Sequence, residues 1–124
     1  MADQLRQRPG DQQLPVPNDG PSMHDLVIAD LGSCGVTWAE NDAAAELIRA
    51  RRQVGLDRYG SLLQAGNGRD WLRDLREECA DAAVYARQGI EELRGRPEQH
   101  AAYDAYEHVL SALFQVLKIP GAAS

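Results

Sequence analysis

Four carboxylates follow one another at helical spacing in the middle of the chain. Asp74, Glu78 and Asp81 recur at steps of four and three residues, and Glu77 borders them. At about 100° per residue these positions fall on one narrow strip of a helix. Carboxylate oxygens are the ligands that a hard cation such as Mg²⁺ prefers, together with the phosphate oxygens of a substrate. A metal held there would polarise a phosphate and position a water for attack on it.

The same strip has a plainer interpretation as a solvated helix face, because it lies nearly opposite the apolar stripe of its own helix. Like charges one turn apart repel, but neighbouring arginines can offset part of that cost. However, Val84 and Tyr85 continue the strip where a solvated face would carry Lys or Gln. This favours partial cover by another helix or another subunit. The neighbouring arginines are Arg69, Arg73 and Arg76.

Three short motifs precede and include the strip, in this order along the chain. They are Arg58-Tyr59-Gly60, Asn67-Gly68-Arg69-Asp70, and a helix from Asp74 to Gln88 that contains Glu77-Glu78-Cys79-Ala80-Asp81. Together, over residues 45–94, they resemble the MazG-like nucleotide pyrophosphohydrolases, and in particular small phage and actinobacterial proteins. The resemblance implies an all-α fold that forms dimers or tetramers. It also implies Mg²⁺-dependent cleavage of a nucleoside triphosphate to the monophosphate and pyrophosphate, with Mn²⁺ as the alternative metal.

The resemblance also assigns roles on the acidic helix. It implies that Glu78 and Asp81 bind the metal and that Glu77 is a further ligand or assists the base. Asp74 lies one turn earlier and would join them. The expected metal ligands are therefore Asp74, Glu78 and Asp81, and the expected catalytic residues are Glu77 and Glu78.

Substrate contacts are expected from arginines and aromatic residues near the strip. Arg69 precedes the N-terminus of the acidic helix, where an anion is favoured. The forked guanidinium matches phosphate oxygens, which makes Arg58 a second candidate. Trp71 and Tyr85 border the strip and could stack on a nucleobase. Each has a structural alternative: surface ion pairs for the arginines and packing at a subunit interface for the aromatic residues.

The preceding helix departs from the family pattern. MazG-like proteins carry a second acidic motif there, whereas this helix contains Glu46 and several arginines. The second set of carboxylate ligands for the metal is then missing or supplied from elsewhere in the chain. Asp104 or Glu107 of the last helix are candidates for these ligands. His100, Asp104 and His108, at four-residue steps, could also line up on a metal or simply form a solvated face.

The remaining sequence predicts an all-α chain without strand-like alternation, arranged as a small bundle of three longer helices plus a short N-terminal one. Ser22 and Asp70 are expected N-caps, Thr37 and Glu40 fit a capping box, and Gly55 is expected to end the second helix. The expected ranges are 22–31, 37–54, 71–94 and 97–118. The expected buried positions are Leu26, Val27 and Leu31; Ala44, Leu47, Ile48 and Val54; Leu72, Leu75, Cys79, Ala82, Ala83, Ala86, Ile90 and Leu93; and Ala102, Ala105, Tyr106, Val109, Leu113, Phe114 and Leu117.

Composition sets the remaining expectations. Residues 1–21 are polar and rich in Gln and Pro, which predicts a disordered or loosely docked arm before an all-α domain at 22–119 and a short tail at 120–124. At 124 residues with 44% hydrophobic residues, the chain forms one small core, for which a homodimer or homotetramer would add buried surface.

Charge and cysteine content exclude several classes. The net charge of −6 argues against nonspecific nucleic-acid binding, which needs a basic face. No signal peptide or membrane-length apolar run is apparent, so a cytoplasmic protein without membrane contact is expected. Cys34 and Cys79 lack the paired spacing of a zinc site and are too few for a disulfide scaffold.

Two other functions fit the same residues. The first is a non-enzymatic helical protein-interaction module of phage or regulatory type, which the missing second acidic motif favours. The second is sequestration of a nucleotide or signal molecule without turnover. Both predict that no pyrophosphate is released.

Overall fold

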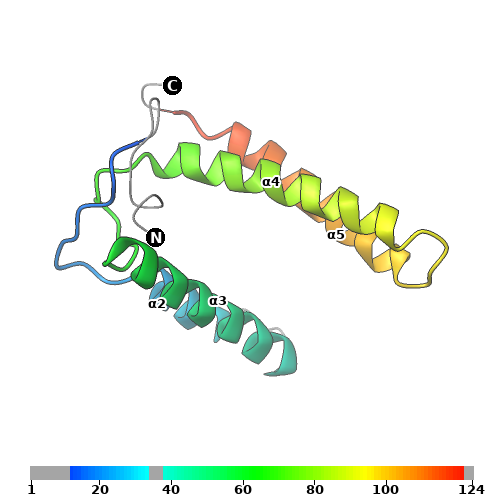
Figure 1. Ribbon diagram of the computed structural model, residues 1–124, viewed down its shortest axis with the longest axis horizontal. Coiled ribbons are helices and arrows are strands. Elements are labelled where there is room, and N and C mark those ends of the chain that lie inside the picture. Colours follow the sequence, from blue (N-terminus) through cyan, green and yellow to red (C-terminus); the bar gives the residue numbers. More distant parts are fainter. Residues whose placement is uncertain (1–11, 34–37, 122–124) are drawn as a thin grey trace. The chain divides into compact units, whose positions relative to one another are not determined.

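The computed structural model describes residues 12–33 and 38–121, and these contain four α-helices and no strand. The helices are α2 (Met23–Leu31), α3 (Trp38–Tyr59), α4 (Trp71–Glu92) and α5 (Gln99–Leu117) (Figure 1). This confirms the predicted all-α class with three longer helices and one short one. None of these helices combines the length and apolar character that a membrane span requires. The chain divides into two compact units, Met1–Arg69 and Asp70–Ser124.

The first unit is built on α2 and α3, which pack against one another. As predicted, Ser22 caps α2, its Oγ accepting a hydrogen bond of 3.4 Å from the Asp25 N–H. At the other end of α2, the Asn41 side chain donates a hydrogen bond to the Leu31 carbonyl. Ala45 is buried at the centre of this small core. The predicted capping box at Thr37 lies outside the described residues, as does Cys34.

The predicted buried side of α3 is only partly covered. Leu47, expected in the core, is 64% exposed, and Val54 is exposed as well. The reason is that the short α2 is the only described helix that packs on α3. On α2 itself, Leu26 and Val27 are likewise exposed, contrary to expectation.

The predicted end of α3 at Gly55 is wrong, because the helix continues to Tyr59. No atom lies within 4 Å of the place where a Cβ of Gly55 would stand, and its backbone stays helical. The helix ends instead at Gly60, whose φ of +72° lies in the left-handed region that favours glycine. Arg49, Arg51 and Arg52 therefore lie in the middle of α3, away from its C-terminal carbonyls.

Residues 12–22 run along the loop that follows α3. The Val16 N–H donates to the Asn67 carbonyl at 2.9 Å, and the Met23 N–H donates to the Leu63 carbonyl at 2.8 Å. Asn67 is buried, and Gly66 and Gly68 on either side of it have positive φ, so the Asn67-Gly68 pair lies in a turn. The first eleven residues of the predicted arm lie outside the described range.

The second unit is a helical hairpin in which α4 and α5 pack side by side (Figure 1). Asp70 caps α4 as predicted, its carboxylate accepting a hydrogen bond of 3.1 Å from the Arg73 N–H. Leu72, Ile90 and Val116 are buried between the helices. The stripe predicted for α4 is buried or half-buried, apart from Leu75, which is 37% exposed.

The start and the outer side of α5 differ from expectation. The helix begins at Gln99, two residues after the predicted Pro97, because the N–H groups of Gln99 and His100 make tight-turn bonds to residues 96 and 97. Phe114 and Leu117, assigned to the buried stripe, are exposed because α4 covers only one side of α5 in the hairpin. Ala105 is exposed for the same reason.

Candidate functional site

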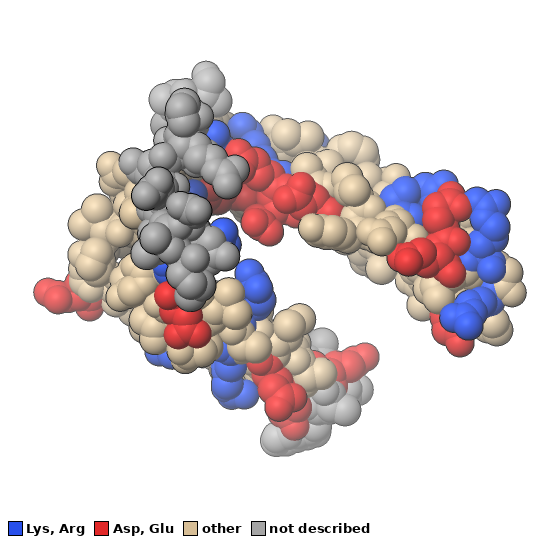
Figure 2. All heavy atoms as spheres, viewed as in Figure 1, with Lys and Arg blue, Asp and Glu red and all other residues tan. Residues whose placement is uncertain are grey.

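The acidic strip lies on the N-terminal half of α4. The Asp70 cap starts the helix one turn earlier, so helical geometry brings Asp74, Glu78 and Asp81 onto a common face. Asp74 is half-buried, and Glu78 and Asp81 are exposed. Figure 2 shows acidic side chains gathered over this part of α4, followed along the helix by an uncharged stretch.

The carboxylates of the strip differ in their partners. Glu77 Oε1 lies 3.0 Å from Arg73 Nε, one turn earlier, in an exposed ion pair. Glu78 and Asp81 make no hydrogen bond or ion pair with any other described residue. An exposed pair such as that of Glu77 contributes little to stability, about 0.3–0.5 kcal/mol. Glu78 and Asp81 are therefore more available than the paired Glu77 to bind a cation or a hydrogen-bond donor from outside the unit.

The strip does not form a metal cage by itself. Within residues 12–33 and 38–121, no three His, Cys, Asp or Glu side chains converge closely enough to hold a metal ion. Asp74 and Asp81 are separated by two turns, and each turn advances about 5.4 Å along the helix. Mg²⁺ is commonly bound through one or two carboxylates plus water and phosphate oxygens. Glu78 and Asp81 are suited to provide that part of a site.

The candidates on α5 do not complete the cage within the part of the chain that the structure describes. The His100 Nε2 atom lies 3.7 Å from Asp104 Oδ2, and the His108 Nδ1 atom lies 2.7 Å from the Asp104 backbone carbonyl. All three side chains, and that of Glu107, are exposed. His108 thus bonds the backbone of its own helix, and the predicted alignment of these residues on a metal is not formed among the described residues.

The predicted aromatic residues stand beside the strip. Trp71 is 62% exposed and Tyr85 is 71% exposed. Together with Leu75, Glu78 and Ala82 they recur at steps of four and three residues, which places them on one side of α4. This second stripe shares Leu75 and Ala82 with the stripe that packs on α5, while the side chains of Trp71, Glu78 and Tyr85 are exposed. The two rings are predicted either to stack on a nucleobase or to pack at a subunit interface, and both roles require exposed rings.

The two predicted phosphate-binding arginines belong to the first unit, and each has a partner there. The Arg58 guanidinium lies 5.6 Å from the centroid of the Tyr59 ring, in a cation–π contact. Arg69 Nη1 donates a hydrogen bond of 2.9 Å to the Gln13 carbonyl. The Arg58 contact lies within the last turn of α3, whereas the Arg69 bond ties the loop after α3 to the segment before α2.

One group of residues was missed by the sequence reasoning. An open groove of about 530 Å³ runs between α2 and α3. The sequence pattern that could have revealed the groove is the spacing of Arg49, Arg52 and Gln53. This spacing puts three side chains that carry hydrogen-bond donors on one face of α3. The residues that line the groove are Asp25, Ile28, Ala29, Arg49, Arg52 and Gln53.

Comparison of the chain with protein-family models, with curated proteins and with solved structures finds no match in any of the three.

Proposed function

We propose that this chain is a Mg²⁺-dependent nucleoside triphosphate pyrophosphohydrolase of the MazG-like type, or a relative that binds the nucleotide without turnover, and that it acts as a homodimer or homotetramer. One observation carries the proposal. Glu78 and Asp81 stand exposed on one face of α4 without a partner among the described residues, beside the exposed rings of Trp71 and Tyr85. The ordered motifs that resemble the MazG-like family supply the substrate class.

Each residue of the strip has a defined part in the proposed reaction. Glu78 and Asp81 would hold the metal, and Asp74 would support them from the preceding turn. The bound ion would neutralise phosphate charge and favour attack by water. Glu77 would leave its exposed ion pair with Arg73 and accept a proton from that water. The products are the nucleoside monophosphate and pyrophosphate, with the water oxygen retained on one of them.

The proposal includes a second copy because the described residues do not bring three ligating groups together. The second stripe of α4 is suited to that contact, since exposed apolar surface beside polar residues often marks an interaction site. Its next position after Tyr85 is Gly89, which has no described atom within 4 Å of where its Cβ would stand. A glycine inside a helix costs about 1 kcal/mol relative to alanine. Close approach of a partner helix would explain its presence.

The test is an activity assay on the purified full chain with a panel of ribo- and deoxyribonucleoside triphosphates and either Mg²⁺ or Mn²⁺. We expect release of pyrophosphate and a fall in kcat/KM of about 100-fold in Glu78→Gln and Asp81→Asn, the scale of a lost electrostatic contribution. Glu46→Gln, an exposed carboxylate on α3, is the matched control and should retain activity. Absence of pyrophosphate, together with no effect of Glu78→Gln on metal or nucleotide binding, would overturn the proposal.

A second candidate is a non-enzymatic helical interaction module, and the uncovered stripe with Trp71 and Tyr85 favours it. A thermal-shift experiment with Mg²⁺ and a non-hydrolysable nucleotide separates the candidates, because a ligand that binds only the folded state must raise Tm. The enzyme and the nucleotide-sequestering protein both predict a rise. The interaction module predicts an oligomer that is weakened by Trp71→Ala and indifferent to metal and nucleotide.

A further inference from the structure

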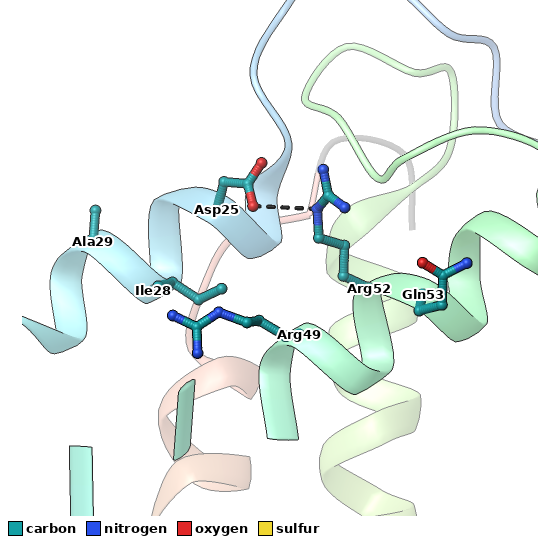
Figure 3. A pocket seen from close by; sticks show the side chains of 6 residues that line it. All are labelled: Asp25, Ile28, Ala29, Arg49, Arg52 and Gln53. Atoms are coloured by element: carbon teal, nitrogen blue, oxygen red, sulfur yellow. Dashed lines mark ion pairs between the residues drawn. The ribbon is translucent and has the colours of Figure 1, made fainter. Parts of the chain in front are cut away.

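The groove between α2 and α3 has a charge opposite to that of the chain as a whole. The protein carries a net charge of −6, yet two arginines face a single carboxylate here. Figure 3 shows Asp25 and Ile28 on the α2 wall and Arg49, Arg52 and Gln53 on the α3 wall. The volume of about 530 Å³ lies within the range of small-molecule sites.

Arg52 is held in place but retains unused donors. Its Nε atom lies 3.2 Å from Asp25 Oδ1 (Figure 3), in an ion pair that leaves the arginine side chain 32% exposed. The same Nε atom is shielded from solvent, but the alignment with Asp25 does not meet the geometry of a hydrogen bond. A guanidinium has five N–H donors, and no other described group takes up those of Arg52. An oxyanion in the groove would satisfy them.

Arg49 lies one turn before Arg52 and has no partner among the described residues. In Figure 3 its guanidinium extends toward Ile28 of α2. Gln53, the residue after Arg52, also lines the groove, and its Nε2 donates a hydrogen bond of 2.8 Å to Asp57 Oδ1. The α3 wall thus offers two forks that match phosphate oxygens, while Ile28 and Ala29 offer an apolar surface opposite. An inorganic anion without a carbon skeleton would contact only the two arginines and not the apolar surface.

We propose that this groove binds a small phosphate monoester. Arg49 and Arg52 donate hydrogen bonds to its phosphate oxygens, and its carbon skeleton lies against Ile28 and Ala29. Asp25 competes with the phosphate for Arg52, which keeps the affinity modest. The site lies wholly within the first unit and uses no residue of the acidic strip, so it stands whether or not α4 supports hydrolysis.

The test is isothermal titration of the full chain with ribose 5-phosphate in buffer containing EDTA, which silences any metal-dependent binding at α4. We expect Arg49→Ala to weaken binding about tenfold, the equivalent of one lost charge-assisted hydrogen bond. Arg49 has no described partner, so this variant should fold normally. Arg52→Lys keeps the charge but loses the fork, and it should also weaken binding. Asp25→Asn removes the competitor and should tighten binding several-fold.

Arg51→Ala is the matched control, because Arg51 carries the same charge on the same helix but does not line the groove. The affinity of Arg51→Ala for ribose 5-phosphate should stay within about twofold of that of the wild type. An exposed charge outside the groove attracts the phosphate only weakly, because salt screens it. Three results would overturn the proposal: no binding of ribose 5-phosphate, an equal loss in Arg51→Ala and Arg49→Ala, or equal affinity for inorganic phosphate and the monoester. The last would show that Ile28 and Ala29 take no part.

Discussion

The side-chain amide of Gln64 pairs with the backbone of Asn18 much as a neighbouring strand residue would. Its Oε1 accepts a hydrogen bond of 3.0 Å from the Asn18 N–H, and its Nε2 donates one of 2.7 Å to the Asn18 carbonyl. The same Nε2 also donates to the Gly20 carbonyl at 2.6 Å. One side chain thereby fixes the extended segment before α2 to the loop after α3.

Replacement of Gln64 by alanine should loosen that segment. Water can reach these exposed groups, so the net loss is expected to be about 1–2 kcal/mol in the free energy of unfolding. Hydrogen exchange at the Asn18 amide should become faster. Gln88→Ala is the control, because Gln88 makes one exposed bond to Glu92 within α4. Unchanged exchange at Asn18 would contradict the assigned role of Gln64.

Gly55 within α3 and Gly60 directly after it should respond in opposite directions to substitution by alanine. Gly55 lies inside the helix with open space around it, so Gly55→Ala should raise stability by about 0.5–1 kcal/mol. Gly60 has a φ of +72°, so Gly60→Ala should lower stability by about 1–2 kcal/mol. Urea denaturation of both variants measures the difference. A shift of the same sign in both would show that α3 ends elsewhere.

The core of the second unit depends on Ile90, which is 2% exposed. Ile90→Ala should destabilise the chain by about 2–5 kcal/mol, because it removes buried methyl groups and leaves a cavity. Val84 is 68% exposed on the same helix, and Val84→Ala should change stability by less than about 0.5 kcal/mol. Thermal unfolding at low protein concentration measures both. Similar losses in the two variants would mean that the packing face of α4 is assigned incorrectly.

A carboxylate near the α4–α5 turn should make stability depend on pH. The hydrogen bond from Arg94, and then that from Arg87, lower the pKa of Glu91 below its ordinary value of 4.5. Since the folded-state pKa is depressed, this contribution is fully present above pH 4.5 and is lost as the pH falls through the lower, folded-state value. The difference in unfolding midpoint between the wild type and Glu91→Gln should therefore be present at pH 7 and close as the pH falls below 4.5. If the difference in unfolding midpoint stayed constant down to pH 3, the proposed pH dependence of the Glu91 contribution would be contradicted.

The fold was predictable from sequence where it depends on neighbours along the chain. Ser22 and Asp70 act as N-caps because a short side chain reaches an N–H three residues on, whatever the rest of the protein does. Gly55 failed as a stop signal because its backbone stays helical, whereas that of Gly60 turns left-handed and ends α3. Leu47 failed as a core residue because burial requires a neighbour, and none of the described helices covers it.

The candidate site divides in the same way. The sequence by itself determined that Asp74, Glu78 and Asp81 share a face of a helix, because helical periodicity is local. Only the tertiary structure decided that Arg49 and Arg52 line a groove with α2, and that Gln64 holds Asn18. Those relationships join residues far apart in the sequence, and their geometry depends on how whole elements pack.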